Sequence, residues 1–530
     1  MKPNFTFLLF VSLFTFTQSK VKAQAVDKAD SMALVDLYNS TKGNSWTNHD
    51  NWLSQLPVST WHGITLSCNR VISIDLGVNN LTGKLPTSVS KLTALQYLYL
   101  YNNKLTGAIP SLFSNLVNLK EFLAGTNSLT GSLPSSLGKL INLQQLDVSH
   151  NQLSGTIPFA IGSLQNAQYI NLSNNKLSGN IPVTIGNLAS VRILEMADNQ
   201  LSGSIPAAIG NLANLQYLYL QNNKLSGAIS SSVGKLQSLQ VLYIDNNRLS
   251  GSIPDAIGDL ANLQLLSLNN NQLAGSIPSS IGNLSALSQL YLNNNELHGA
   301  APSSFINLAN LQYLYLDHNH LSQGTNKNPV LPLNVFLHAD ISHNDFTFDG
   351  MEFIATHYPF ITYSPQASLA IHNNGESISL HAGGTLSNNS YTWYKIEDKS
   401  SMAIKGDSSF QPATGGHYYA QVRNAVATRL ILYTDTFEYA MPSQTDKTTT
   451  AIARSQGSQT FSVYPNPARN IVHIKTDGSA VITITDADGK RLFSKTISGN
   501  DVIDVSRLTQ GIYYIHNQAT GETQKLIVVQ

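Results

Sequence analysis

The chain has 530 residues, with 31 Lys plus Arg against 31 Asp plus Glu, and only 12% of its residues are charged. That length favours several domains over a single core. A net charge of zero removes the electrostatic case for binding nucleic acid or an anionic membrane surface, because both need a clustered basic excess.

The first 25 residues have the pattern of a secretory signal peptide. Lys2 gives a short positive start, an apolar run extends from Phe5 to Phe16, and Ala23 and Ala25 form an A-x-A cleavage signal. The run is too short for a membrane span, and no later stretch approaches the length of a membrane helix. The sequence therefore predicts an exported chain (signal peptide 1–25) with no integral membrane span.

Residues 26–70 combine a short helical pattern that opens at Asp30 with three tryptophans, Trp46, Trp52 and Trp61. They also contain the only cysteine of the sequence, Cys68. A single cysteine excludes a disulfide framework and a multi-cysteine metal site within one chain. Free cysteine ordinarily behaves as a small buried apolar residue, and we expect this of Cys68.

A fixed period of 24 residues dominates residues 71–358. Each unit reads L-x-x-L-x-L-x-x-N-x-L, and most units continue as L-x-G-x-I-P. The central asparagines are Asn79, Asn103, Asn127, Asn151, Asn175, Asn199, Asn223, Asn247, Asn271, Asn295 and Asn319, and a weaker twelfth unit follows with Phe336, Ile341, Asn344 and Phe346.

This pattern predicts a short strand, a turn and an irregular or 3₁₀ return in each unit. Stacked units would share one continuous core, in which each fully buried side chain contributes about 1.5–3 kcal/mol. We expect the recurrent asparagine to turn inward and bond backbone amides, the glycine to permit the close turn, and the proline to restrict the return path. These residues are then scaffold and not ligand sites.

The units resemble the plant-type class of leucine-rich repeat, which is defined by the same L-x-G-x-I-P signature. Residues 26–70 resemble the N-terminal cap of such proteins, although that cap often has paired cysteines and this one has only Cys68. The resemblance implies a repeat solenoid of about twelve units, with a cap held by its helix and its tryptophans.

Tyrosines recur at the strand positions that would point outward onto the concave sheet. Because these positions vary between units, they would carry any specificity, and a protein, a peptide or a long glycan could bind there. Asparagines such as Asn102, Asn222 and Asn294 lie nearby. The alternative is that tyrosine simply suits a half-exposed sheet. The candidate ligand-binding residues are Tyr97, Tyr99, Tyr101, Tyr169, Tyr217, Tyr219, Tyr243, Tyr291, Tyr313 and Tyr315.

A second candidate lies at the end of the repeats. Neighbouring strands would place His318 beside His343, close to the carboxylates of Asp317 and Asp340. Two imidazoles and a carboxylate could hold a divalent metal. Polar residues that close an end repeat are the ordinary interpretation and the one that we prefer.

Residues 360–440 lose the period and alternate in short strand-like segments, which predicts a small antiparallel sandwich. Trp393 and the sequence Gly416-x-Tyr418-x-Ala420 resemble the core Trp and the tyrosine corner of an immunoglobulin-like domain, with Ala420 in place of the usual Cys. Trp393 and Tyr418 are then core residues. Residues 441–459, rich in Ser, Thr, Gln and Ala, predict a flexible linker.

Residues 460–530 are again strand and turn, and predict a second small β-sandwich. Their YPNP start at Tyr464, their G-I-Y-Y strand at Gly511 and their Lys-led apolar terminus from Lys525 resemble the type A C-terminal sorting domain of the type IX secretion system. The resemblance implies a Bacteroidota-type bacterium and passage through the type IX machinery. The cargo of that family is then released or attached to surface lipopolysaccharide.

No catalytic motif of the common hydrolase, metalloprotease or phosphate-loop kinds occurs, and the sequence implies no cofactor. Carboxylates such as Glu195, Asp245 and Asp317 are scattered over different units. We therefore expect a secreted or cell-surface binding or adhesion protein without enzyme activity. A structural surface or matrix component without a specific ligand is the alternative, and an enzyme is a distant third.

Overall fold

A computed structural model describes residues 26–323, 338–441 except 359 and 376, and parts of 462–528 (462–464, 471–486, 490–506, 508–509, 511–519 and 523–528). The chain divides into two compact units, Met1–Pro442 and Ser443–Gln530. The expected signal peptide, Phe336 of the twelfth repeat and residues 442–459 of the expected linker lie outside the described residues. None of the helices in the described ranges is long and apolar enough to cross a membrane.

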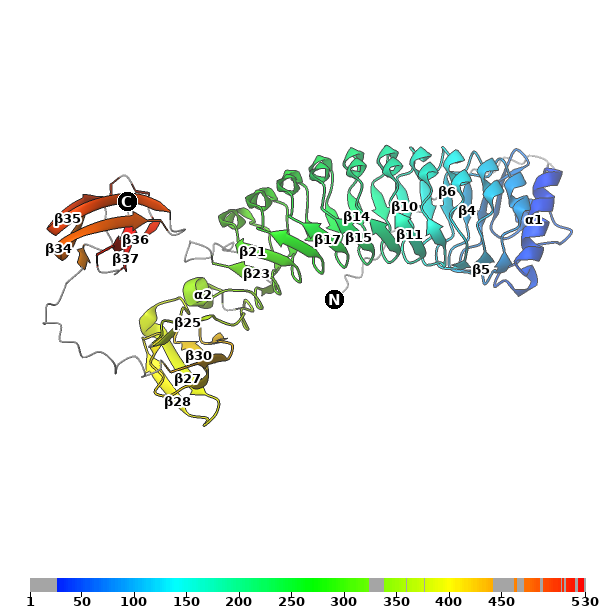
Figure 1. The fold of residues 1–530 in the computed structure, drawn as a ribbon. Helices are drawn as coiled ribbons and strands as arrows, with labels where there is room; N and C mark the ends of the chain where they lie inside the picture. Colours follow the sequence, from blue (N-terminus) through cyan, green and yellow to red (C-terminus); the bar gives the residue numbers. More distant parts are fainter. Residues whose placement is uncertain are drawn as a thin grey trace. The chain divides into compact units, whose positions relative to one another are not determined.

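The repeats stack into a solenoid whose main sheet has 13 strands (Figure 1). The first strand, β1 (Ile64–Ser67), pairs antiparallel to β2, and every later pairing in this sheet is parallel. The parallel strands are β2 (Arg70–Asp75), β4 (Tyr97–Tyr99), β6 (Glu121–Leu123), β8 (Gln145–Asp147), β10 (Tyr169–Asn171), β12 (Ile193–Glu195), β14 (Tyr217–Tyr219), β16 (Val241–Tyr243), β18 (Leu265–Ser267), β20 (Gln289–Tyr291), β22 (Tyr313–Tyr315) and β24 (His338–Asp340).

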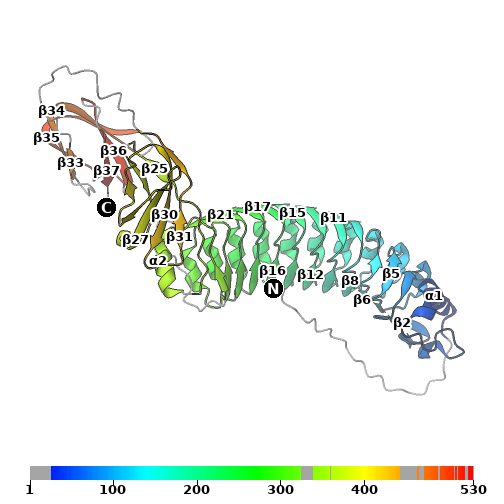
Figure 2. The same ribbon diagram turned by 90° about the horizontal axis from the view of Figure 1, so that it is seen from below.

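We call the central asparagine of each repeat its ladder asparagine. Short strands that follow the ladder asparagines form the edge of the stack opposite the main sheet (Figure 2). One sheet of three contains β3 (Thr82–Lys84), β5 (Lys104–Gly107) and β7 (Ser128–Leu129). A sheet of eight contains β9 (Ser154–Thr156), β11 (Lys176–Asn180), β13 (Gln200–Gly203), β15 (Lys224–Gly227), β17 (Arg248–Gly251), β19 (Gln272–Gly275), β21 (Glu296–Ala300) and β23 (His320–Ser322). We call these two sheets together the second sheet layer.

Ten units return through one 3₁₀ turn each in the described part of the repeats, as the sequence predicted. The ten turns run from η3 (Thr87–Lys91) through η8 (Ala207–Asn211) to η12 (Ser303–Asn307), spaced by one repeat. A proline with φ near −66° precedes η8, in agreement with its expected role in the return path. Gly203 of the L-x-G motif has φ +71°, a conformation that favours glycine.

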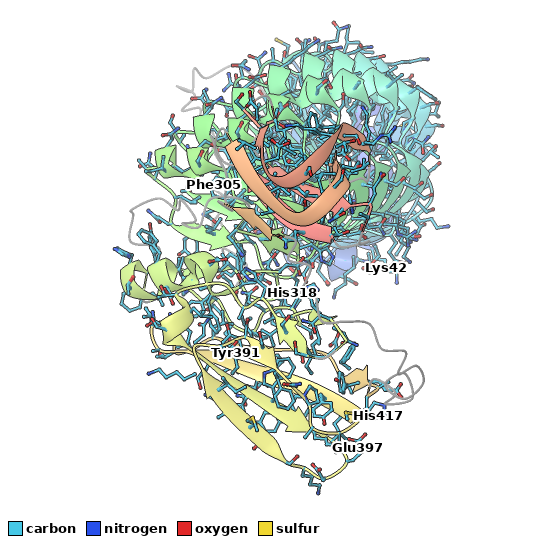
Figure 3. All side chains as sticks on the ribbon, turned by 60° about the vertical axis from the view of Figure 1, so that its left-hand side comes forward. Lys42, Phe305, His318, Tyr391, Glu397 and His417 are labelled. Atoms are coloured by element: carbon cyan, nitrogen blue, oxygen red, sulfur yellow. The ribbon has the colours of Figure 1, made fainter. Side chains whose placement is uncertain are left out.

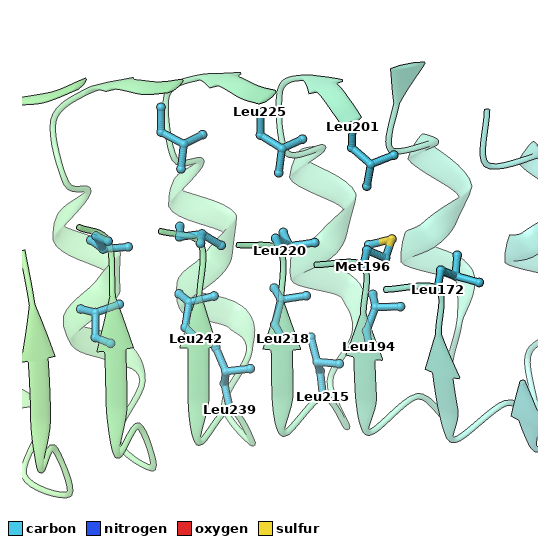
Figure 4. Packing of buried hydrophobic residues seen from close by; sticks show 14 of the residues in the cluster. Leu172, Leu194, Met196, Leu201, Leu215, Leu218, Leu220, Leu225, Leu239 and Leu242 are labelled. Atoms are coloured by element: carbon cyan, nitrogen blue, oxygen red, sulfur yellow. The ribbon is translucent and has the colours of Figure 1, made fainter. Parts of the chain in front are cut away.

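Leucines and isoleucines from successive repeats form the continuous core of the solenoid. Leu194, Leu218 and Leu242 on neighbouring strands are at most 1% exposed and stack above one another, while Leu201 and Leu225 fill the opposite side of the same interior (Figure 4). A unit on its own would leave these side chains exposed, so the stability of each unit depends on its neighbours.

The ladder asparagine joins each unit to the one before it. The Asn103 side-chain carbonyl accepts hydrogen bonds from the backbone N–H groups of Asn79 (3.0 Å) and Leu81 (2.9 Å). Its Nδ2 donates to the backbone carbonyls of Leu76 and Leu100 at 2.8 and 2.9 Å. The expected bonds to backbone amides are therefore confirmed, and the side chain satisfies backbone carbonyls as well.

The N-terminal end of the stack is covered by α1 (Lys28–Ser40), η1 (Gly43–Ser45) and η2 (Val58–Thr60) (Figure 1). Trp46, Trp52 and Trp61 pack in sequence, with ring centroids 4.9 Å apart at both contacts, and Tyr38 of α1 stacks on Trp52 at 5.7 Å. The cap is held by its helix and its tryptophans, as expected.

Two features of this cap were not predicted. Asp30 is fully buried and accepts hydrogen bonds from Arg70 Nε and Nη2, both at 2.9 Å, and from the Val71 N–H at 2.8 Å, which ties α1 to the first parallel strand. Cys68 is exposed, so its expected burial is wrong. With Asn69 it forms the two-residue turn between β1 and β2, where φ is +45° and +60°, and a hairpin turn of this kind lies at the surface.

The solenoid continues for one step beyond its twelfth unit. Thr362 N–H donates to the Ala339 carbonyl at 2.9 Å, and Ile341 N–H donates to the Thr362 carbonyl at 2.8 Å. The Gln366 side chain takes the place of a ladder asparagine: its carbonyl accepts from Asn344 N–H at 3.0 Å, and its amide donates to the Ile341 carbonyl at 3.1 Å. The helix α2 (Phe348–His357) lies at this end of the stack.

The chain after the repeats forms two facing sheets in the same compact unit as the solenoid. One contains β25 (Ile371–Asn373), β26 (Ile378–Leu380) and β29 (Ser409–Phe410). The other contains β27 (Asn389–Lys395), β28 (Ser401–Lys405), β30 (Gly416–Asn424), β31 (Ile431–Tyr433) and β32 (Phe437–Tyr439). The 3₁₀ turn η13 (Leu386–Asn388) precedes β27.

Trp393 and Tyr418 are core residues of this sandwich, as predicted. Trp393 stacks on Phe410 of the facing sheet with centroids 5.4 Å apart, and is 1% exposed. Tyr418 Oη donates to the Thr414 carbonyl at 2.7 Å, the bond expected of a tyrosine corner. Glu397 and His417 pair at one tip of the sheet, with Oε1 and Nδ1 2.7 Å apart (Figure 3).

The second compact unit is a five-stranded antiparallel sheet with its own core. Its strands are β33 (Ser462–Tyr464), β34 (Ile471–Thr485), β35 (Arg491–Asp504), β36 (Gly511–Asn517) and β37 (Thr523–Val528). The long strand β34 pairs with three others. Ile474, Ile482, Ile515 and Leu526 are at most 1% exposed and belong to this core.

Candidate functional site

The outward side of the main sheet carries the candidate binding residues. We define the sheet face as three positions in each unit from β2 to β24: the first and third residues of the strand's L-centred triplet and the second residue after it, as in Tyr217, Tyr219 and Gln221. All ten candidate tyrosines occupy such positions and all are half-buried. The alternation within each strand buries the central residue, such as Leu218, and leaves its neighbours on the face.

Aromatic rings from neighbouring strands stack on one another in the C-terminal half of this face. Tyr219 stacks on Tyr243 with centroids 5.5 Å apart, and Tyr291 stacks on Tyr315 at 5.3 Å, with the ring planes within 16° of parallel in both pairs. Tyr313 stacks on His338 at 5.6 Å. The sheet spacing therefore converts a repeated sequence position into a surface of oriented rings.

Two tyrosine hydroxyls of this face are fixed by side chains of the next unit, one from the sheet face and one from the residue before a strand. Tyr99 Oη donates to Glu121 Oε2 at 2.7 Å, and Tyr217 Oη donates to Gln240 Oε1 at 2.9 Å. Because these bonds hold the rings before any partner arrives, less side-chain entropy would be lost on binding.

Glu195 is the most perturbed carboxylate of the sheet face. Burial, followed by the charge of Asp147, raises its pKa from 4.5 to about 7, and a hydrogen bond with Tyr169 acts in the opposite direction. Burial likewise raises the pKa of Asp245, whose carboxylate accepts a hydrogen bond from Ser267 Oγ at 3.2 Å. Such partly buried charges favour contacts with cationic or hydrogen-bond-donating groups.

The asparagines beside the tyrosines have a backbone role. Asn102, Asn174, Asn222, Asn246, Asn270 and Asn294 have φ between +52° and +57°, the left-handed region that Asn tolerates better than most residues. Asn222 also donates to Asp198 Oδ1 at 2.8 Å. Backbone conformation is thus enough to explain why asparagine recurs here.

His318 and His343 lie together, as predicted from the repeat spacing. Their rings stack with centroids 4.0 Å apart and planes within 10° of parallel, and His318 Nδ1 lies 2.9 Å from Asp317 Oδ2. Within the part of the chain that the structure describes, no three His, Cys, Asp or Glu side chains are grouped to hold a metal ion. The pair closes the end of the sheet face as a stacked imidazole couple.

Sequence reasoning placed Asp317 and Asp340 at outward positions but overlooked Glu195 and Asp245 as members of the same surface. Glu195, Asp245 and Asp317 lie in different units, yet each occupies a sheet-face position. The signal was available, because these residues fall on the same repeat positions as the tyrosines.

Comparisons with protein families match two parts of the chain. Residues 462–530 match the secretion system C-terminal sorting domain. Residues 171–274 match a leucine-rich repeat region, and residues 277–321, 94–116 and 142–164 match leucine-rich repeats.

Individual relatives match part of the chain. A probable leucine-rich repeat receptor-like protein kinase of Arabidopsis thaliana is 49% identical over 63 residues, which are 11% of this chain and 7% of that protein. The solved plant peptide hormone receptor RGFR1 in complex with RGF2 is similar with a TM-score of 0.51 and 32% identity, over 54% of this chain and 46% of the receptor chain.

The Arabidopsis receptor kinase HAESA, solved with the peptide hormone IDA and the co-receptor SERK1, has a TM-score of 0.49 and 26% identity, over 64% of this chain and 62% of that chain. The chain thus spans less than two thirds of each of these relatives.

Proposed function

Since the chain carries leucine-rich repeats and a type IX C-terminal sorting domain, which directs proteins to the cell surface or exterior, we propose that it is an exported binding protein without enzyme activity. Its partner would be a protein held on the sheet face. The observation that carries the proposal is the concentration of ten half-buried tyrosines at the outward strand positions, which vary between units while the scaffold positions stay constant.

The likeness to RGFR1 supports a polypeptide partner over a polysaccharide, because that peptide hormone receptor was solved in complex with RGF2. Leucine-rich repeats are also typical of binding proteins and not of enzymes. The proposed division of labour follows the predicted boundaries: cap 26–70, repeats 71–358, sandwich 360–440, linker 441–459 and sorting domain 460–530. The solenoid would bind, and the final domain would determine where binding occurs.

The direct test is a protein and glycan array probed with the purified protein and with the triple variant Tyr217→Ala, Tyr219→Ala and Tyr243→Ala. We expect a protein ligand whose signal falls at least tenfold in this variant, because three rings of one surface are removed.

The matched control removes three tyrosines from the sandwich instead, Tyr394→Ala, Tyr419→Ala and Tyr433→Ala. Of these, Tyr394 and Tyr419 stack at 4.8 Å on the β27–β30 sheet, away from the sheet face. The control variant should keep full binding, and circular dichroism should show that both variants stay folded. Equal binding by the sheet-face variant would refute the proposal, and a silent array would favour a structural surface component.

The route of export has a separate test. Deletion of residues 461–530 should trap the protein in the periplasm, since the sorting domain directs passage across the outer membrane. Normal surface display of the truncated chain would contradict its sorting role.

A further inference from the structure

The charged residues on the sheet face of the repeat array all have one sign. All sheet-face positions from β2 to β24 lie in the described part of the chain, and none of them is Lys or Arg. Seven are acidic: Asp75, Glu121, Asp147, Glu195, Asp245, Asp317 and Asp340. A random distribution of the array's charges would mix both signs, so the sheet face is an anionic surface in an otherwise neutral chain.

The cations of the repeats lie outside the sheet-face positions, many of them on the second sheet layer or the 3₁₀ turns. Exposed lysines and an arginine occupy its strands in several units, namely Lys84, Lys104, Lys176, Lys224 and Arg248. Lys120 and Arg192 each lie one residue before a main-sheet strand, and Arg70 begins β2 and pairs with Asp30 of the cap. Among the described residues, no Lys or Arg forms an ion pair with a sheet-face carboxylate.

Carboxylates lie beside aromatic rings in the C-terminal half of this face, from β14 to β24. Asp245 follows Tyr243 by two residues and is 9% exposed, and Asp317 follows Tyr315 in the same way and is also 9% exposed. Burial of a carboxylate without a cationic partner is unfavourable, and a bound cation would relieve it. His318 contacts Asp317, and no comparable ring nitrogen is recorded near Asp245 in the described chain.

The same surface already holds one cation over a tyrosine. Lys120 Nζ lies 5.9 Å from the centroid of the Tyr97 ring, within the range of a cation–π contact. A ring face together with a nearby carboxylate is the combination that binds ammonium and guanidinium groups well.

The spacing of the carboxylates favours an extended chain over a compact one. Asp245 and Asp317 occupy equivalent positions three strands apart, which is about 14 Å at about 4.8 Å per strand. An extended polypeptide advances about 3.3 Å per residue, so cationic side chains about four residues apart would meet both carboxylates.

We propose that the sheet face from β14 to β24 binds an extended segment of a partner protein through its Lys or Arg side chains. This inference rests on the proposed function and adds the chemical class of the partner. The carboxylates attract the cationic groups, and the stacked tyrosines hold their apolar stems.

The first experiment uses three 16-residue probes in a Gly/Ser background, measured by fluorescence anisotropy with the full protein at low and high salt. One carries arginine at every fourth residue, the second carries neutral citrulline at the same places, and the third carries glutamate. We expect the arginine peptide to bind at least tenfold more tightly than the citrulline peptide in 50 mM salt. The difference should shrink at least threefold in 500 mM salt, because exposed charges are screened.

The second experiment compares two charge-matched variants. Asp245→Asn with Asp317→Asn removes two sheet-face charges and should weaken binding of the arginine peptide at least fivefold. Asp255→Asn with Asp259→Asn removes two exposed charges from η10 (Asp255–Asp259), on the return side of a repeat, and should leave binding unchanged. Thermal unfolding of both variants controls for loss of fold.

Equal affinity for the arginine and citrulline peptides, or equal effects of the two double variants, would overturn the inference. The inference can fail while the proposed function stands. If an array ligand depends on Tyr217, Tyr219 and Tyr243 but not on salt or on the two carboxylates, the sheet face binds a partner of another class. A neutral polysaccharide that gives this result would exclude the cationic segment.

Discussion

Two adjacent asparagines in one repeat should differ sharply in their effect on stability. Asn223 is a ladder asparagine and is 9% exposed, whereas Asn222 is exposed and has φ +57°. The perturbation compares Asn223→Ala with Asn222→Gly. The repeat pattern already assigns the two residues to different positions, and the contrast tests the hydrogen bonds that the structure gives them.

The expected magnitude follows from the bonds that each side chain makes. Asn223 Nδ2 donates to the carbonyls of Met196, Leu220 and Gln221 at 3.0, 3.1 and 3.3 Å, and its carbonyl accepts from Leu201 N–H at 2.9 Å. At about 1 kcal/mol for each net hydrogen bond, the loss of all four should lower the free energy of unfolding by about 3–4 kcal/mol.

Asn222→Gly removes one exposed bond and retains a residue suited to positive φ. The change in unfolding free energy should stay below about 1 kcal/mol. The two neighbours should therefore differ by about 3 kcal/mol.

The assay combines urea unfolding, followed by circular dichroism, with amide hydrogen exchange. Exchange is needed because units of a solenoid open partly independently of one another. In Asn223→Ala, peptides around Leu201 and Leu220 should lose protection first, while the cap around Trp52 keeps it. Similar effects of both substitutions, or loss of protection only at distant repeats, would refute the ladder as the coupling between units.

Three further changes test other parts of the structure. Arg70→Met leaves the buried Asp30 carboxylate unpaired and should lower the unfolding free energy by about 2 kcal/mol, less than for a fully buried pair because Arg70 is 33% exposed. Ser230→Pro should raise it by about 0.5 kcal/mol in urea unfolding, since φ is already −66° there and Pro occupies the equivalent place before η8. As the pH rises from 4.5 to about 7, the free energy of unfolding should fall, because the raised pKa of Glu195 lets the folded chain keep a proton that the unfolded chain releases. Glu195→Gln should abolish this fall.

Each of these has a clear contrary result. An unchanged urea midpoint for Arg70→Met would mean that the Arg70–Asp30 pair does not tie the cap to the first parallel strand. A lower midpoint for Ser230→Pro would show that its hydrogen bond to Ser232 N–H, at 3.2 Å, outweighs the chain-entropy gain. Parallel pH profiles of the protein and Glu195→Gln would place the pH dependence on another group.

Much of the architecture could be derived from local sequence because repeats obey local rules. The 24-residue period specifies the strand, the turn and the return of each unit. Each unit then buries its leucines against a neighbour with the same pattern. The role of Gln366 could not be predicted in this way. Its side chain makes the hydrogen bonds of a ladder asparagine, but it is a glutamine and lies beyond the 24-residue period. Cys68 escaped it because burial was inferred from residue type, while a two-residue hairpin turn placed the side chain at the surface.

The features of the proposed binding surface also fall into those that the sequence predicts and those that depend on tertiary structure. The sequence by itself determined that Tyr217, Tyr219 and Tyr243 point outward, since alternation along a strand needs no tertiary information. Only the tertiary structure decided that rings 24 residues apart stack and that burial raises the pKa of Glu195 to about 7. The physical reason is that stacking and desolvation depend on distances between different units, which are fixed when the strands assemble into a sheet.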